Sequence, residues 1–223
     1  MLSAKDIYKS YGKTPVLSGV SLEAKRGAVV GVAGANGSGK STLLSIMCGL
    51  LKPDSGGASL DGRDIFRDPR TRRKLGLVPQ ESAVFDDLSV CDNIRFWASA
   101  YKTNYEPRLM TPSDMQKKAR VLSGGMRKRL NIELALVNTP EFLVLDEPTS
   151  GLDLVYQLQV KEIISRLKDE GCGVVLTSHN TDELWDCDTI YVLYQGVFIY
   201  SGTPAEFCDK EKFRDRLYNI ISG

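Results

Sequence analysis

The sequence of 223 residues predicts an α/β fold, in which helices cover both faces of a mainly parallel sheet. Short apolar runs that fit buried strands alternate with amphipathic helical segments; these runs are 29–33, 142–146, 174–178 and 190–194. We expect a single domain over 1–223. Its α/β core comprises 1–81 and 139–223, and 82–138 is an inserted helical subdomain, since that stretch carries helical patterns and no convincing strand.

The other elements follow in chain order. Residues 2–22 alternate in patches between the breakers Gly12, Pro15 and Gly19, which predicts an antiparallel β subdomain beside the main sheet. A helix is expected to open at Ser41, directly after the first buried strand. Near the other end of the core, Gly171 is a plausible helix stop after apolar residues at helical spacing, namely Tyr156, Val160, Ile163, Ile164 and Leu167.

Composition and charge restrict the class of protein. The chain is 42% hydrophobic, and 29 basic residues against 28 acidic ones leave a formal charge of +1, so the overall charge predicts neither a nucleic-acid partner nor binding to an anionic membrane surface. No segment approaches the roughly 18 consecutive apolar residues of a membrane span, and no signal-peptide core is apparent. We expect reduced thiols, because the cysteines lack metal-binding or disulfide spacing; they are Cys48, Cys91, Cys172, Cys187 and Cys208.

A glycine-rich loop lies between the first buried strand and the helix that follows it. Residues 34–41 read Gly-Ala-Asn-Gly-Ser-Gly-Lys-Ser. Glycines let successive backbone N–H groups turn toward phosphate oxygens, and the helix N-terminus adds its dipole at the same point. Lys40 would reach the β- and γ-phosphates, and the Ser41 hydroxyl would hold Mg²⁺. A glycine-rich turn that happens to precede a lysine is the structural alternative.

Polar residues follow two further apolar runs. Asp146 and Glu147 end the run at 142–146, which puts them at the same edge of the sheet as the glycine-rich loop. Asp146 should hold Mg²⁺, and Glu147 could deprotonate the water that attacks the γ-phosphate. His179, the only histidine, follows 174–178 and can face the same phosphates. Taken alone, Asp146 and Glu147 also fit an acidic loop after a buried strand, and His179 also fits a structural histidine.

The sequence also contains the run Leu122-Ser-Gly-Gly-Met126. With this set of motifs, the sequence resembles the nucleotide-binding subunits of ATP-binding cassette (ABC) transporters over nearly its whole length. The resemblance implies a P-loop NTPase (RecA-like) core and an Mg²⁺-dependent ATPase. It identifies 34–41 as the Walker A loop, Gln80 as the Q-loop glutamine and metal ligand, and His179 as the switch histidine. Asp146 and Glu147 match the Walker B pair. ATP is expected at Tyr11, Gly34, Asn36, Gly37, Ser38, Gly39, Lys40, Ser41 and Thr42, although Tyr8 is close enough to replace Tyr11 as the aromatic that stacks on adenine.

The signature run implies a second cassette. Ser123, Gly124 and Gly125 stand where a helix begins, with Leu130, Leu134 and Val137 as its apolar stripe, so hydroxyl and N–H groups form an anion site. In the family, this site and the D-loop aspartate, here Asp153, close over the ATP held by the opposing Walker A loop. A head-to-tail dimer with an identical or homologous subunit is therefore implied. Met126 departs from the usual glutamine. Without the family resemblance, a helix cap is the structural alternative for 122–126.

The family also implies an integral membrane permease as partner and a peripheral location on the cytoplasmic face of the membrane. The stretch 88–96 resembles the helix-entry segment of drug, lipid or polysaccharide exporter subunits, so export is the expected direction. Aromatic residues of the insertion either dock a permease helix or belong to the core; they are Phe85, Phe96, Trp97 and Tyr101. The alternative function is a soluble single-cassette ATPase that acts on a protein scaffold, as in iron–sulfur cluster assembly.

Overall fold

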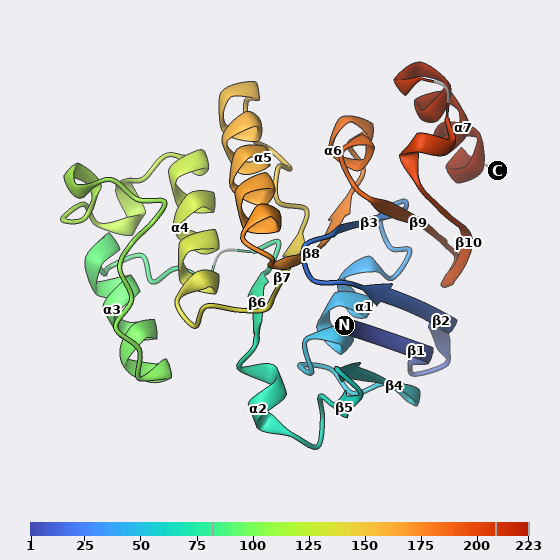
Figure 1. The fold of residues 1–223 in the computed structure, drawn as a ribbon, viewed down its shortest axis with the longest axis horizontal. Helices are drawn as coiled ribbons and strands as arrows, with labels where there is room; N and C mark the ends of the chain where they lie inside the picture. The colour runs from blue at the N-terminus through green and yellow to red at the C-terminus, as the bar shows by residue number, and fades with distance from the viewer. Residues whose placement is uncertain (82, 208, 223) are drawn as a thin grey trace.

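Two β-sheets and the helices around them make up the computed structural model, which describes residues 1–81, 83–207 and 209–222 (Figure 1). The larger sheet has the strand order β10-β9-β3-β8-β7-β6. All neighbours in it are parallel except β10, which pairs antiparallel with β9. The strands are β3 (Val29–Ala33), β6 (Leu75–Val78), β7 (Phe142–Asp146), β8 (Gly173–Ser178), β9 (Thr189–Tyr194) and β10 (Val197–Gly202).

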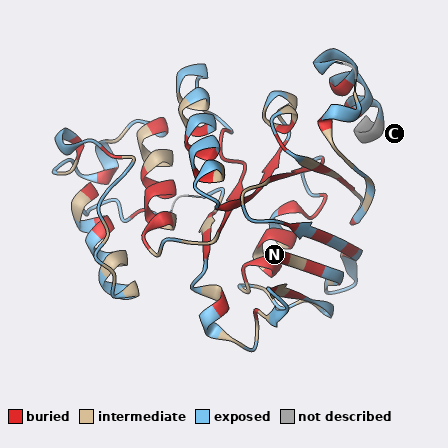
Figure 2. Ribbon diagram, viewed as in Figure 1, coloured by how far each residue is buried: buried red, intermediate tan, exposed pale blue. Residues whose placement is uncertain are grey.

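The four apolar runs predicted as strands are confirmed as β3, β7, β8 and β9. Every residue of β3, β7 and β8 is buried, because helices cover both faces of the sheet, and this explains their nearly uninterrupted apolar sequence (Figure 2). The predictions did not include β6 and β10. The first has only four residues, and the second is a half-exposed edge strand.

A smaller antiparallel sheet, of order β2-β1-β4-β5, confirms the strands predicted in 2–22. Its strands are β1 (Leu2–Tyr11), β2 (Thr14–Ala24), β4 (Ser55–Leu60) and β5 (Arg63–Asp64). The last two were not predicted. Gly19 has a positive φ of 80°, and a Cβ there would lie 2.9 Å from the Tyr8 hydroxyl, so glycine makes room for the Tyr8 ring across the sheet.

Helix α1 (Lys40–Met47) packs between the two sheets in one buried cluster, which includes Leu43, Leu44, Ile46 and Met47. Helices α5 (Leu154–Asp169), α6 (Thr181–Trp185) and α7 (Lys210–Ser222) contribute to a second cluster with the larger sheet. The short elements are α2 (Pro69–Arg72) and the 3-10 turns Pro112–Asp114, Ala119–Val121 and Pro204–Glu206. Within the described residues, none of the helices combines the length and apolarity needed to cross a bilayer.

The described part of 82–138 contains α3 (Val90–Tyr101), α4 (Gly124–Leu136) and a single isolated β-bridge between Ser89 and Lys118. The stripe predicted for α4 is confirmed, because Leu130, Leu134 and Val137 are buried in a cluster local to this part of the chain. The opposite side of α4 puts Ile132 and Leu136 into the core of the larger sheet, so one helix serves two clusters. The subdomain bounds 82 and 138 stay a prediction.

A buried carboxylate orders the loop between α3 and α4. Glu133 of α4 is fully buried. It accepts backbone N–H groups from Arg108, Leu109 and Met110 at 3.0, 2.7 and 2.9 Å, together with the hydroxyl of Tyr105. These donors satisfy the charge inside a part of the chain that has little regular structure.

Candidate functional site

A cavity of about 570 Å³ opens at the carboxyl ends of the parallel strands. Gln80 follows β6, Glu147 follows β7, His179 follows β8, and the glycine-rich loop follows β3. Ligand sites of parallel sheets form at this edge because the connecting loops meet there. The lining residues are Tyr11, Val16, Asn36, Gly37, Gly39, Lys40, Ser41, Thr42, Gln80, Glu147, Ser150 and His179.

The glycine-rich loop and α1 form an anion-binding surface. Gly37 and Gly39 have positive φ values of 80° and 106°, and a Cβ at Gly39 would lie 2.9 Å from the Val16 carbonyl oxygen. The N-terminus of α1 has no side-chain cap and no acidic residue in its first turn, so its N–H groups and dipole face the loop unopposed. Ser38 Oγ is buried without a partner among the described residues and lies next to Gly34, so its side chain does not line the cavity. Gly34 lies behind the lining, against the Leu193 carbonyl.

Lys40 is the buried cation of the loop. Its Nζ donates to the carbonyl oxygens of Gly34 and Ala35 at 2.8 and 3.1 Å and lies 3.9 Å from Glu147 Oε1. Burial lowers the pKa of Lys40, while the charges of Glu147 and Asp146 oppose that shift. An ammonium group has three donors, so one remains for a phosphate oxygen.

The two carboxylates at the carboxyl end of β7 are both buried, and a neighbouring strand holds them in place. Thr177 of β8 lies opposite Asp146 in the strand register. Its hydroxyl donates to Asp146 Oδ1 at 2.6 Å and accepts the backbone N–H of Glu147 at 3.0 Å. Glu147 has a φ of 48°, a costly left-handed conformation for a non-glycine residue. The hydrogen bond from the Glu147 N–H to the Thr177 hydroxyl fixes the turn that directs the Glu147 side chain into the cavity.

His179 is 61% exposed at its side chain, and its Nδ1 lies 3.6 Å from Glu147 Oε2. The imidazole therefore reaches the carboxylate that is predicted to activate water. Ser41 and Gln80 line the cavity, and Asp146 directly precedes the lining residue Glu147. Oxygen donors of these types suit a hard cation such as Mg²⁺, and their role as its ligands stays a prediction. Within the described ranges, no cluster of three or more His, Cys, Asp or Glu side chains forms a metal site of its own.

Tyr11 and Tyr8 have different surroundings. Tyr11 is 54% exposed and lines the cavity, whereas Tyr8 lies against Gly19 and is not among the lining residues. The structure therefore brings Tyr11 to the site together with Asn36 and Thr42. Its stacking on adenine stays a prediction.

The signature residues and Asp153 do not line this cavity. Ser123 Oγ caps α4 by accepting the Met126 N–H at 3.3 Å, and Asp153 caps α5 by accepting the Tyr156 N–H at 3.1 Å. Tyr156 lies between them, because its hydroxyl is 3.2 Å from Ser123 Oγ and a Cβ at Gly125 would overlap its ring. Ser123 and Gly124 are exposed at the start of α4. The start of α4 is thus separate from the cavity of the same chain, and its role as an anion site stays a prediction.

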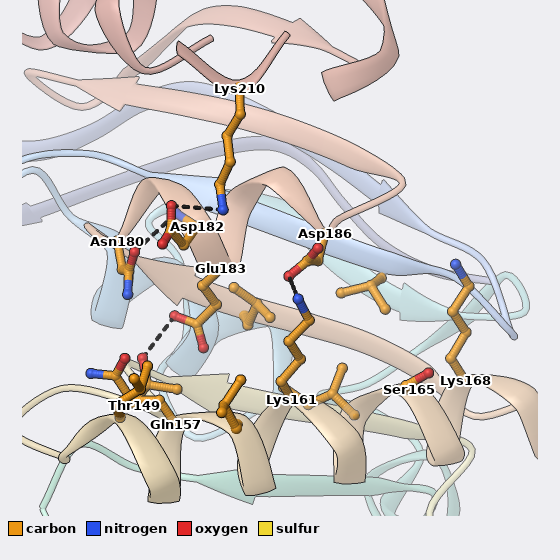
Figure 3. A pocket seen from close by; sticks show the side chains of 15 residues that line it. Thr149, Gln157, Lys161, Ser165, Lys168, Asn180, Asp182, Glu183, Asp186 and Lys210 are labelled. Atoms are coloured by element: carbon orange, nitrogen blue, oxygen red, sulfur yellow. Dashed lines mark hydrogen bonds and ion pairs between the residues drawn. The ribbon is translucent and has the colours of Figure 1, made fainter.

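A second groove, of about 460 Å³, lies between α5, α6 and α7 (Figure 3). Ion pairs from Lys161 to Asp186 at 2.6 Å and from Lys210 to Asp182 at 2.9 Å cross it. It shares Glu183 and three other residues with a cavity of about 80 Å³ that reaches Glu147 and His179. Burial raises the pKa of Glu183, whose carboxylate accepts the Thr149 hydroxyl at 3.2 Å.

Sequence reasoning missed Thr177 and Glu183 at this site. A signal for Thr177 was present, because Thr177 and Ser178 are buried polar residues at the end of a strand whose other residues are apolar. Glu183 had no comparable signal, since its approach to Thr149 depends on how α6 folds back beside β8.

Comparison with known proteins agrees with this geometry. A protein-family profile described as ABC transporter matches residues 17–150. The lipopolysaccharide export system ATP-binding protein LptB of Escherichia coli (strain K12) is 37% identical and covers 97% of this chain and 96% of its own length. The linearmycin resistance ATP-binding protein LnrL of Bacillus subtilis (strain 168) is 34% identical over 94% of this chain and 71% of its own length.

Among solved structures, a dimeric post-hydrolysis ATP-binding cassette bound to ADP and Pi is 25% identical, with a TM-score of 0.83. The similarity covers 92% of this chain and 99% of that one. The fold, the order of the motifs and the extent of these matches agree with one another. The chain belongs to the ABC transporter family and is one of its ATP-binding subunits.

Proposed function

We propose that this subunit hydrolyses Mg·ATP in a head-to-tail dimer and thereby drives export through a separate membrane permease. The observation that carries the proposal is the cavity at the strand ends, where Lys40, Glu147 and His179 converge. These side chains come from three different loops, and together they supply a phosphate-binding cation, a base and a histidine that contacts the base.

The roles follow from the contacts. Lys40 and the N–H groups of α1 bind the phosphates. Bound Mg²⁺, held by Ser41, Gln80 and Asp146, would neutralise charge that develops on the phosphate oxygens. Glu147 orients the attacking water and takes its proton. His179, at 3.6 Å from Glu147, positions that carboxylate against the γ-phosphate.

A second cassette would complete the site. Ser123, Gly124 and Asp153 are exposed and away from the cavity of their own chain, which fits a role in the partner's site. Directly after Asp153, Leu154, Val155 and Leu158 are 69, 63 and 56% exposed, an apolar surface that a partner would cover. The structural relative that binds ADP and Pi is itself dimeric, which supports this arrangement.

Export through a permease is supported by two relatives, whose names describe lipopolysaccharide export and linearmycin resistance. The insertion offers a docking surface. Phe85 and Phe96 are 42 and 49% exposed and stack edge to face, with ring centroids 4.9 Å apart. Trp97 and Tyr101 instead pack against the local core. A permease helix on the phenylalanine pair would keep the subunit at the cytoplasmic face of the membrane.

The Glu147→Gln variant tests the proposed chemistry. It removes the base but preserves the shape of the side chain, so ATPase turnover should fall at least about 100-fold. ATP binding and ATP-dependent dimers, measured by light scattering, should persist. Glu162→Gln is the matched control, because Glu162 is an exposed glutamate on α5 that pairs with Arg166.

Normal turnover by Glu147→Gln would contradict the assignment of the base. A variant that stays monomeric in excess Mg·ATP, even with its permease present, would contradict the dimer.

A further inference from the structure

The charge of this chain is distributed unevenly. Residues 63–74 contain six basic and two acidic side chains, a formal charge of +4. The rest of the chain contains 23 basic and 26 acidic residues, a formal charge of −3. The nearly neutral total therefore conceals one strongly basic segment, which comprises β5, α2 and the approach to β6.

This segment presents its cations to solvent. Five of its basic side chains are exposed and define the basic patch: Arg63, Arg67, Arg70, Arg73 and Lys74. Side-chain exposure reaches 72% for Arg63 and 89% for Arg67. Among the described residues, no carboxylate lies within ion-pair distance of Arg70 or Arg73. The patch thus holds positive charge that the protein itself does not neutralise.

The acidic groups next to the patch are already engaged. Arg26 holds Asp61 with two hydrogen bonds, of 2.9 and 2.6 Å, and also contacts Glu141. Asp68 caps α2 through the backbone N–H of Arg70 at 2.9 Å. A hollow of about 240 Å³ runs through the patch, lined by Leu60, Asp61, Arg63, Asp68, Arg70, Thr71 and Lys74. It can admit a phosphate-sized group beside Arg70.

An exposed apolar side chain lies near the basic segment 63–74. Leu50 is 69% exposed, and the preceding residue, Gly49, is so close to Arg72 of this segment that a Cβ there would lie 2.9 Å from Arg72 Cδ. Lys52 is exposed two residues later. A leucine exposed near a basic segment suits the interface of a bilayer, where phosphates meet the arginines and acyl chains accept the leucine.

We propose that the basic patch binds the anionic phospholipid surface of the membrane directly, independently of the permease. The family places this subunit beside a membrane, and clusters of four to eight basic residues suffice for such binding. The only aromatic residue of the segment, Phe66, packs against the core, so the patch lacks the exposed rings that single-stranded nucleic acid would stack on.

Vesicle flotation with the purified full chain, without nucleotide, tests this inference. Vesicles of phosphatidylcholine mixed with phosphatidylglycerol are compared with pure phosphatidylcholine at low and high salt. The double variant R70Q/R73Q removes the two unpaired charges. The matched control R166Q/R214Q removes two exposed arginines of α5 and α7, which lie far from α2 in Figure 1.

The chain should bind the anionic vesicles only, and salt should weaken the binding. R70Q/R73Q should lower the partition coefficient about 30-fold, as expected for two basic groups at an anionic surface. The control should stay within about twofold. Equal loss in both variants, or equal binding to neutral vesicles, would overturn the inference. The inference would also be overturned if the patch bound an acidic segment of the permease but did not bind lipid. Binding to vesicles that contain no permease does not depend on ATPase activity, so this proposal and the proposed function can fail separately.

Discussion

The hydroxyl of Thr177 donates to Asp146 at 2.6 Å across the β7–β8 ladder. The same oxygen accepts the N–H of Glu147, the residue held at positive φ. A single side chain thus positions both carboxylates of the candidate site. Water cannot replace these hydrogen bonds of the Thr177 hydroxyl, because Thr177 is fully buried.

Replacing Thr177 by valine should therefore affect both stability and activity. The change keeps the side-chain shape but leaves a buried acceptor and a buried N–H unpaired, at a cost of about 2 kcal/mol in the free energy of unfolding. We expect kcat to fall about 100-fold because the Glu147 carboxylate is no longer held in its orientation, and ATP affinity should change less. Steady-state kinetics and urea unfolding measure both. Thr177→Ser keeps the hydroxyl and should retain most activity; similar losses in both variants would argue against this role.

The exposed phenylalanine pair should matter only in the presence of the permease. The double variant F85A/F96A removes two rings that cover little of the core, so ATP binding and folding should be preserved. Affinity for the permease in detergent should drop about 30-fold if the pair is an anchor. Tyr218→Ala on α7, which removes a ring that is 70% exposed, is the control. Unchanged co-purification of F85A/F96A would place the docking surface elsewhere.

The Glu133 network should be a stability determinant rather than part of catalysis. Glu133→Gln replaces one acceptor oxygen by an N–H₂ group that faces backbone donors, so the free energy of unfolding should drop by about 3 kcal/mol. Urea titration provides the measurement. Glu106→Gln, an exposed change in the same loop, should have little effect. A Glu133→Gln protein as stable as the unsubstituted chain would show that the loop does not depend on this carboxylate.

The buried thiols should limit stability in alkali. Burial raises the pKa of Cys48 from its ordinary value of 9.0 to about 12 and that of Cys172 to about 11. Between pH 9 and 12 the unfolded chain loses thiol protons that the folded chain keeps, so the free energy of unfolding should fall as pH rises through this window. Unfolding curves from pH 8 to pH 11 test this.

Substitution separates the contribution of Cys48 from that of other groups. Cys48→Ala removes one of these thiols and should make the alkaline decline less steep than in the unsubstituted chain. Equal slopes for the variant and the unsubstituted chain would mean that other groups cause the decline. Cys208 lies outside the described residues.

The sequence predicted most of the larger sheet because burial on both faces leaves continuous apolar runs, as in β3, β7 and β8. The four residues of β6 include Gly76, and β4 contains Gly56 and Gly57, so neither run shows a strand pattern. The candidate site was recognisable where its residues are adjacent in sequence, as in 34–41. Thr177 was not recognisable, because its partner depends on the register of two strands 31 positions apart.

Helix α4 connects the larger sheet with the insertion, because its side chains pack into the cores of both. Ile132 and Leu136 pack into the core of the larger sheet, whereas Leu130 and Leu134 pack into the core of the insertion. Neither the sheet nor the insertion can therefore unfold without exposing apolar surface of the other. Heating should therefore produce one calorimetric peak for the whole chain. Amide protons of α4 should exchange as slowly as those of the central strands.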